Sequence, residues 1–215
     1  DMFLSNIIGT LYTTLNPIIL SIFSGTYATG VYSTCEKIIG AFNGISNAVS
    51  QAVYPIVCKV VTEKPYLKLD NKLKIPISFI YFGWWPLLIL ILAFLTMWKS
   101  KFILELIIGN TVTFEQTILL RIMVFIPFAV SLGHLFGIQT LLPMNNRRGV
   151  RVSIVRGAVT NMVLGISGAI YFGAIGMGIA LLICEMVVAI SMFRYLTSML
   201  MNNKVIVRKG KVINE

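Results

Sequence analysis

The sequence predicts an all-α, polytopic membrane protein with six transmembrane helices. Of its 215 residues, 57% are hydrophobic and 12% are charged, whereas a water-soluble domain carries roughly twice that charged fraction. The mean hydropathy is +0.85. Apolar runs of about 20 residues recur along the chain, which is the length that a helix needs to cross a bilayer core of about 30 Å. Runs so long and so continuously apolar do not fit the alternating strands of an outer-membrane barrel.

The apolar runs assign residues 1–200 to one transmembrane domain and residues 201–215 to a basic cytoplasmic tail. The predicted spans cover about residues 2–23, 31–60, 75–98, 118–142, 152–172 and 175–200. Short turns that contain glycine separate the first span from the second and the fifth from the sixth. Glycines around the last turn would let its two helices approach closely. They are Gly165, Gly168, Gly173, Gly176 and Gly178.

The basic residues are distributed unevenly between the two sides of the predicted membrane domain. The net charge is +10. Fourteen Lys and Arg residues lie in or beside the connections and the tail on one side, three lie on the other side, and Lys37 lies within a span. Cytoplasmic loops of membrane proteins carry such an excess, so we expect both chain ends on the cytoplasmic side. The same asymmetry explains the positive charge without nucleic acid as a partner.

Residues 31–61 form the segment around which the rest of the chain is expected to be organised. At 100° per residue, its polar side chains fall within one arc of about 140°, and bulky apolar side chains cover the other side. The arc contains Ser33, Glu36, Lys37, Gly40, Asn43, Gly44, Asn47, Ser50, Gln51 and Tyr54. In a membrane protein this arc fits the wall of a water-filled cavity. Gly40 and Gly44 also form a GxxxG pattern, so a close helix–helix seam is the alternative interpretation.

Ionisable residues inside a bilayer cost roughly 2.5–3.5 kcal/mol on insertion scales, so each one is a candidate for function. Lys37 would hold an anionic group such as phosphate, unless it pairs locally or extends to the interface. Its neighbour Glu36 points about 100° away on the helix and is not expected to pair with it directly. Glu185, in the last span, would carry a proton in a coupled transporter, unless it makes a structural hydrogen bond. His134, in the fourth span, fits a packed side chain better than a functional one.

Other polar and special residues favour packing roles. Pro17, near the centre of the first span, removes a backbone hydrogen bond and is either a packing kink or a hinge. Asn161 is expected to hydrogen bond across helices. The three cysteines show no metal-ligand spacing and are interpreted as packing residues; they are Cys35, Cys58 and Cys184. No nucleophile–histidine arrangement and no acidic pair on an outer loop is apparent. An enzyme is therefore not expected, and neither is a metal or a cofactor.

Three runs of residues carry a resemblance to a known family. Residues 27–39 read YATGVYSTCEKII, residues 160–164 read TNMVL, and residues 173–185 read GAIGMGIALLICE. In this order they resemble the polysaccharide flippases of the multidrug/oligosaccharidyl-lipid/polysaccharide exporter superfamily, closest to the O-antigen (Wzx-type) branch. The first run is similar to the opening of that family's eighth helix, and the other two are similar to its eleventh–twelfth helix hairpin.

The resemblance implies a two-lobe transporter in the bacterial cytoplasmic (inner) membrane. This chain would be the C-terminal six-helix lobe, and the N-terminal lobe would be missing from it. The implied cargo is the oligosaccharide repeat unit on polyprenyl pyrophosphate, flipped by alternating access for synthesis of O-antigen or a related surface polysaccharide. Lys37 would then contact pyrophosphate, and the amides of Asn43, Asn47 and Gln51 would contact sugar or water.

The resemblance also raises expectations about coupling and partners. A proton or sodium gradient is a possible source of energy, with Glu36 and Glu185 as coupling or structural intramembrane charges and Pro17 as a possible hinge. The expected partners are the lipid-linked oligosaccharide, membrane lipids, the missing lobe and other polysaccharide-assembly proteins.

Three alternatives stay open at this point. A drug/cation antiporter of the same superfamily would suit an acidic cavity without Lys37. A membrane-embedded polymerase or acyltransferase would form product from lipid-linked sugar. A non-transporting assembly partner would depend on a helix seam at Gly40 and Gly44 rather than on a cavity.

Overall fold

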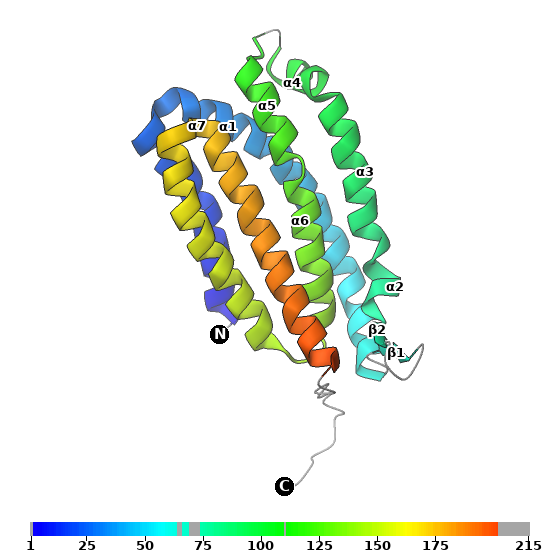
Figure 1. Ribbon diagram of the computed structural model, residues 1–215. Helices are drawn as coiled ribbons and strands as arrows, with labels where there is room; N and C mark the ends of the chain where they lie inside the picture. The colour runs from blue at the N-terminus through cyan, green and yellow to red at the C-terminus, as the bar shows by residue number, and fades with distance from the viewer. Residues whose placement is uncertain (1, 64–65, 69–73, 110, 202–215) are drawn as a thin grey trace.

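The computed structural model describes residues 2–63, 66–68, 74–109 and 111–201, and it is built almost entirely of helices (Figure 1). The basic tail expected at residues 201–215 lies outside the described residues, apart from Met201. The elements in chain order are α1 (Met2–Glu63), β1 (Tyr66–Lys68), β2 (Lys74–Pro76), α2 (Ser78–Phe82), α3 (Trp84–Trp98), α4 (Ser100–Ile108), α5 (Phe114–Met123), α6 (Ile126–Gly133), the π-helix η1 (His134–Leu141) and α7 (Arg147–Met201).

The two longest helices, α1 and α7, each fold back on themselves at a glycine. Gly25 in α1 has φ 83° and ψ 177°, and Gly173 in α7 has φ 58° and ψ −135°. Both φ values lie in the left-handed region, which residues with a Cβ avoid. Each helix therefore has a first limb before its glycine and a second limb after it. In Figure 1 both turns lie at the top, while the start of α1 and the end of α7 lie at the bottom.

The predicted close approach of the last two helices is confirmed in α7. A Cβ on Gly168 would lie 2.7 Å from the carbonyl oxygen of Gly176, and a Cβ on Gly176 would clash with the backbone of Gly168. Further along the limbs, a Cβ on Gly157 would clash with Val188. Helices in a membrane associate through such close van der Waals packing, because the hydrophobic effect does not drive apolar helices together within lipid.

The column formed by α5, α6 and η1 packs against both α1 and α7, and α3 packs on the outside against α6 (Figure 1). One buried apolar cluster joins α1, α5 and α7 near the glycine turns, with Tyr32, Leu119 and Met177 fully buried in it. A second cluster joins α1, η1 and α7 near the opposite end, around Val57 and Leu141. The core is thus formed where the column meets both long helices.

The third and fourth predicted spans each differ from a single α-helix. Residues 74–76 pair with β1 as an antiparallel strand, and the helix that follows is divided at Gly83 into α2 and α3. The fourth span is divided between Met123 and Ile126, where Pro127 occupies the first turn of α6, and it ends in the π-helix η1. Proline at that place has no amide hydrogen to give to the preceding turn, so α5 and α6 do not form one regular helix.

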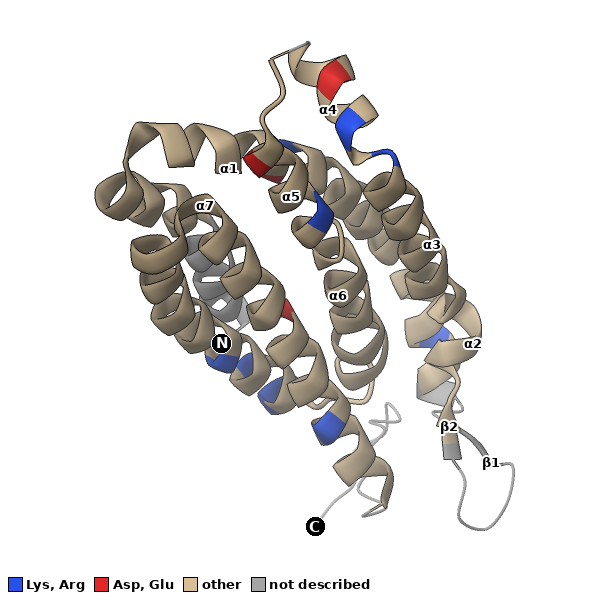
Figure 2. Ribbon diagram, turned by 45° about the horizontal axis from the view of Figure 1, so that its top comes forward, with Lys and Arg blue, Asp and Glu red and all other residues tan. Residues whose placement is uncertain are grey.

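Three helical stretches of the described residues are long and apolar enough to cross a membrane: Ser78–Trp98, Phe114–Leu141 and Arg147–Met201. Together with the helical content, they confirm the predicted all-α membrane protein. Basic residues gather at the end of the molecule where α7 begins and ends, and both acidic and basic residues are seen around α4 and α5 at the other end (Figure 2). The connection after the third predicted span contains a short helix, α4.

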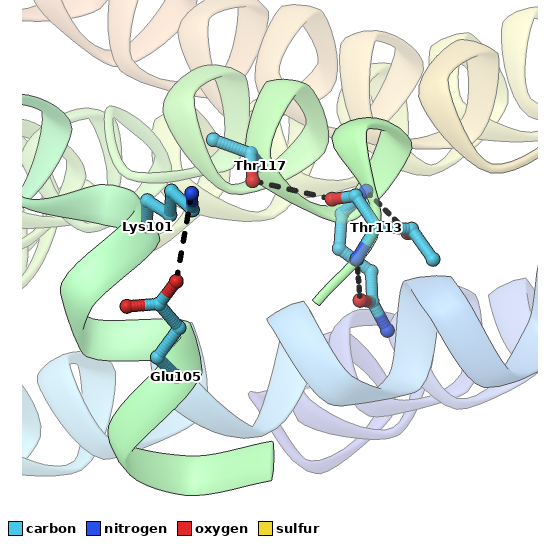
Figure 3. A network of polar contacts seen from close by, with 5 residues as sticks. Lys101, Glu105, Thr113 and Thr117 are labelled. Carbon is cyan, nitrogen blue, oxygen red and sulfur yellow. Dashed lines mark hydrogen bonds and ion pairs between the residues drawn. The ribbon is translucent and has the colours of Figure 1, made fainter. Parts of the chain in front are cut away.

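Local polar contacts fix the connection between α4 and α5 (Figure 3). The Thr113 hydroxyl accepts a hydrogen bond from the Gln116 amide at 3.3 Å, and the Gln116 side chain accepts one from the Thr113 amide at 2.9 Å. This reciprocal pair is a capping box, which satisfies backbone donors at the start of a helix. Lys101 and Glu105 form an ion pair at 3.6 Å on exposed α4.

Candidate functional site

The second limb of α1 carries a polar face that other described elements do not cover. Lys37, Asn47 and Gln51 are exposed, and Asn43 is half-buried. Gly40 and Gly44 lie on the same face, and a Cβ on either of them would meet nothing within 4 Å. The GxxxG seam therefore has no packing partner in the described part of the chain. The structure brings the predicted site residues together on one helix face.

Lys37 is a cation on this open face, without an ion pair to any carboxylate among the described residues. Its neighbour Glu36 is half-buried and lies beside the side chain of Tyr32. Adjacent helix residues point about 100° apart, so one charge faces inward while the other faces outward. Among the described residues the two charges do not form a direct ion pair, and the ammonium group of Lys37 carries three N–H donors.

Two buried hydrogen bonds connect Tyr32, which lies beside Glu36, to α7. Asn161 Nδ2 donates to Asn16 Oδ1 at 2.7 Å, and Asn16 Nδ2 donates to the Tyr32 hydroxyl at 3.4 Å. The Glu36 carboxylate, four residues further along the same limb, interacts with the Tyr32 side chain. The predicted cross-helix bond of Asn161 is confirmed. Sequence reasoning missed Asn16 and Tyr32, although Asn16 precedes Pro17, the predicted hinge.

A second buried polar cluster joins α1, α2 and η1. Gln139 Nε2 donates to the backbone carbonyl of Ser50 at 2.7 Å and also reaches the Ser50 hydroxyl at 3.0 Å. The hydroxyls of Thr140 and Ser78 lie 2.6 Å apart, and Thr140 also donates to the Leu135 carbonyl. The latter bond spans five residues, which matches the π-helical geometry of η1. Sequence reasoning placed Gln139 in a span but assigned it no partner.

The remaining candidates lie elsewhere. Glu185 is half-buried on the second limb of α7, and His134 is buried with 9% of its surface exposed. The sulfur atoms of Cys35 and Cys184 contact the backbone carbonyls of Gln116 and Gly157 from fully buried positions. They pack between helices, as predicted from their positions. In the residues that the structure describes, no three His, Cys, Asp or Glu side chains gather.

Comparison with known proteins gives a consistent result. The family model described as "Polysaccharide biosynthesis protein" matches residues 1–61. A protein of Escherichia coli (strain K12) is 26% identical over 215 residues, covering 96% of this chain and 47% of its own length. A protein of Shigella dysenteriae is 25% identical over 193 residues, covering 89% of this chain and 46% of its own length. Both are named "Putative O-antigen transporter".

These matches confirm the resemblance to O-antigen flippase-type membrane proteins. The chain spans about half the length of the curated relatives that it matches. No solved structure matches it.

Proposed function

We propose that this chain is the C-terminal lobe of a flippase that moves polyprenyl-pyrophosphate-linked oligosaccharide from the cytoplasmic to the outer leaflet of the bacterial inner membrane. The observation that carries the proposal is the exposed, cationic and amide-lined face on the second limb of α1. Relatives named for O-antigen transport support a saccharide-bearing cargo. The remaining length of those relatives leaves room for a second lobe opposite this face.

The proposed topology has six membrane crossings. Each limb of α1 and of α7 makes one crossing, α2 with α3 makes another, and α5 to η1 makes the last. The glycine turns at Gly25 and Gly173 then lie on the outer side. The basic residues at the start of α7 and the basic connection after α1 lie in the cytoplasm, in agreement with the usual excess of Lys and Arg there.

Lys37 is assigned the pyrophosphate. An ammonium group facing lipid would cost several kcal/mol, whereas one facing a water-filled cavity or a phosphate keeps its charge solvated or paired. On the same face, Asn47 lies ten residues after Lys37, nearly three helical turns, and Gln51 lies one turn beyond Asn47. Both are assigned to the sugars or their water. The lipid tail remains in the bilayer. A face with an uncompensated cation is poorly suited to the cationic cargo of a drug antiporter.

Alternating access requires the lobe to change shape or orientation, and the buried line from Asn161 to Glu36 is the proposed coupling element. Protonation of Glu36 would remove its negative charge and add an O–H donor beside Tyr32, which would disturb the Tyr32 hydroxyl and, beyond it, Asn16. Pro17 is the proposed hinge because it follows Asn16 directly. A sodium ion is the alternative coupling ion, and Glu185 is the second candidate carrier. Other proteins of polysaccharide assembly are proposed partners.

The test is the amount of lipid-linked oligosaccharide that reaches the outer leaflet in cells. Full-length protein is compared with Lys37→Ala at equal membrane abundance, and Lys101→Ala is the matched control because Lys101 lies on exposed α4. We expect Lys37→Ala to lower exposure about tenfold, as for loss of a charge-assisted hydrogen bond, and Lys101→Ala to leave it unchanged. If Lys37→Ala leaves the amount of lipid-linked oligosaccharide in the outer leaflet unchanged, the proposed site is refuted. If that amount does not depend on the protein at all, the proposed flippase function is refuted.

A further inference from the structure

Three buried polar atoms on α1 and η1 lack a hydrogen-bond partner among the residues that the structure describes. They are Asn43 Oδ1, His134 Nδ1 and Gln139 Oε1. His134 is 9% exposed and Gln139 is fully buried. Leaving a buried acceptor unsatisfied costs about 1–3 kcal/mol, and such atoms in native proteins call for an explanation. A ligand that donates hydrogen bonds would satisfy all three.

The second limb of α1 and the column that ends in η1 run side by side in the same direction. Near the glycine turns, Cys35 Sγ lies 3.5 Å from the Gln116 carbonyl. Near the other end, Gln139 Nε2 lies 2.7 Å from the Ser50 carbonyl. The contact on α1 thus moves from residue 35 to residue 50 as the column advances from residue 116 to residue 139. Residues between these contacts on the two elements face one common seam.

The three unsatisfied atoms fall on this seam. Asn43 lies between the two contacts, and it precedes Ser46 and Ser50 by three and seven residues, which places all three on one side of the helix. Ser50 is bonded to Gln139, and Ser46 is fully buried. On η1, His134 precedes Gln139 by five residues. In a π-helix these positions are successive neighbours along the axis, so His134 lies on the same side as Gln139.

The bonds already made determine what the ligand must provide. The Ser50 carbonyl can only accept, so the Gln139 atom that contacts it is the nitrogen, and the unsatisfied atom is the carbonyl oxygen. Asn43 likewise leaves an oxygen unsatisfied, and Nδ1 of a neutral histidine accepts in one tautomer. All three sites can therefore accept hydrogen bonds. A sugar hydroxyl can satisfy them, whereas an ionised phosphate, which only accepts, cannot.

We propose that Asn43, His134 and Gln139 form an acceptor band that binds hydroxyl groups of the saccharide, separate from the pyrophosphate contact at Lys37. This inference rests on the proposed function and adds His134 and Gln139 to its saccharide contacts. Lys37 lies six residues before Asn43, about 9 Å along the helix axis, which suits adjoining parts of one glycolipid. The three acceptor atoms are covered in this structure, so the saccharide reaches them when the seam between α1 and η1 opens during transport.

The test measures the affinity of purified full-length protein for two probes. One is a polyprenyl pyrophosphate without sugar, and the other is the same lipid carrying a neutral disaccharide. His134→Leu keeps an apolar side chain of moderate size but removes the acceptor, so affinity for the disaccharide probe should fall about fivefold, as for one neutral hydrogen bond. Affinity for the sugar-free probe should not change. His134→Asn, whose amide oxygen can accept in a similar place, should restore most of the difference.

Two further variants complete the design. Lys37→Ala should weaken binding of both probes, because both carry pyrophosphate. Thr160→Val is the matched control, since the Thr160 hydroxyl bonds only to the carbonyl of Arg156 in its own helix, and it should change neither affinity. If His134→Leu does not fold, Asn43→Leu provides the same comparison, with the same loss restricted to the disaccharide probe.

The outcomes separate the two proposals. An equal loss for both probes, no loss for either, or a wild-type protein that does not distinguish the probes would overturn the acceptor band while leaving the flippase in place. A wild-type protein that binds neither probe would overturn the proposed function, and the acceptor band with it.

Discussion

Glycines serve opposite purposes in the two folded-back helices. In α7, Gly157, Gly168 and Gly176 lie in direct contact between limbs, where no Cβ would fit. In the second limb of α1, Gly40 and Gly44 face open space. The side chains around these glycines differ as well, because the α1 face also carries Lys37 and exposed amides. Small residues among apolar neighbours indicate helix packing, whereas small residues among polar side chains leave room for something other than a helix of this chain.

The largest expected effect comes from filling the contact in α7. Gly176→Val would drive a branched side chain into the backbone of Gly168, and backbone cannot give way as a flexible side chain can. Overpacking costs typically 1–3 kcal/mol and sometimes more, so we expect a clear loss of thermal stability in detergent and low membrane abundance. A Gly176→Val protein as stable as the parent would show that the limbs of α7 are not packed as described.

The turn glycines should give the next largest effect. Gly173→Ala places a Cβ at φ 58°, where L-residues are disfavoured by about 1–2 kcal/mol. Because nothing lies within 4 Å of that Cβ, the loss would come from backbone strain and not from a clash. Thermal unfolding of Gly173→Ala, with Gly30→Ala as a control at an open helical position in α1, should show a lower midpoint for the turn variant alone.

The buried asparagine pair should contribute less. Asn16 and Asn161 are joined at 2.7 Å, and interhelical hydrogen bonds in membranes average about 0.6 kcal/mol, with a maximum near 1.7. A double-mutant cycle with Asn16→Leu and Asn161→Leu should give a coupling energy of about that size. A coupling of zero would mean that the line from α7 to Glu36 is not formed in the native protein.

The smallest expected effect is at the open glycines. Gly44→Ala should leave the unfolding midpoint unchanged or raise it slightly, because alanine favours the helix by roughly 0.5–1 kcal/mol and meets no neighbour. This variant sharpens the comparison with Gly176, since the residue type is the same and only the surroundings differ. A strong loss of stability in the full-length protein would instead support the helix seam.

Sequence patterns were sufficient for the features that depend on local chemistry. The turns at Gly25 and Gly173, the close glycines of α7 and the polar arc of α1 could all be predicted, because each follows from spacing along one helix. The π-helix at the end of residues 114–141 could not, since it depends on how Thr140 and Gln139 meet α1 and α2. The different exposure of Asn43 and Asn47 could not be predicted from the sequence either. They lie four residues apart on one arc, yet only Asn47 is exposed, and that difference is set by neighbouring elements.

The surroundings of Glu36 also show how far local sequence patterns can predict the structure. Its interaction with Tyr32 follows from the spacing of four residues, but the hydrogen bonds from Tyr32 through Asn16 to Asn161 need three limbs to be assembled. Nothing in the local sequence of Asn16 distinguishes it from a residue that accompanies the Pro17 kink.

The central claim is that the exposed face of α1 is lined by water and not by lipid or another helix. The most direct measurement is the reactivity of single introduced cysteines with a membrane-impermeant thiol reagent, in the full-length protein and with Cys58 replaced by serine. Asn47→Cys is compared with Val159→Cys, which is also exposed, on α7, but among apolar neighbours. We expect Asn47→Cys to react well above the parent and to be protected by lipid-linked oligosaccharide, while Val159→Cys stays unreactive. Equal and low reactivity at both positions would contradict the cavity.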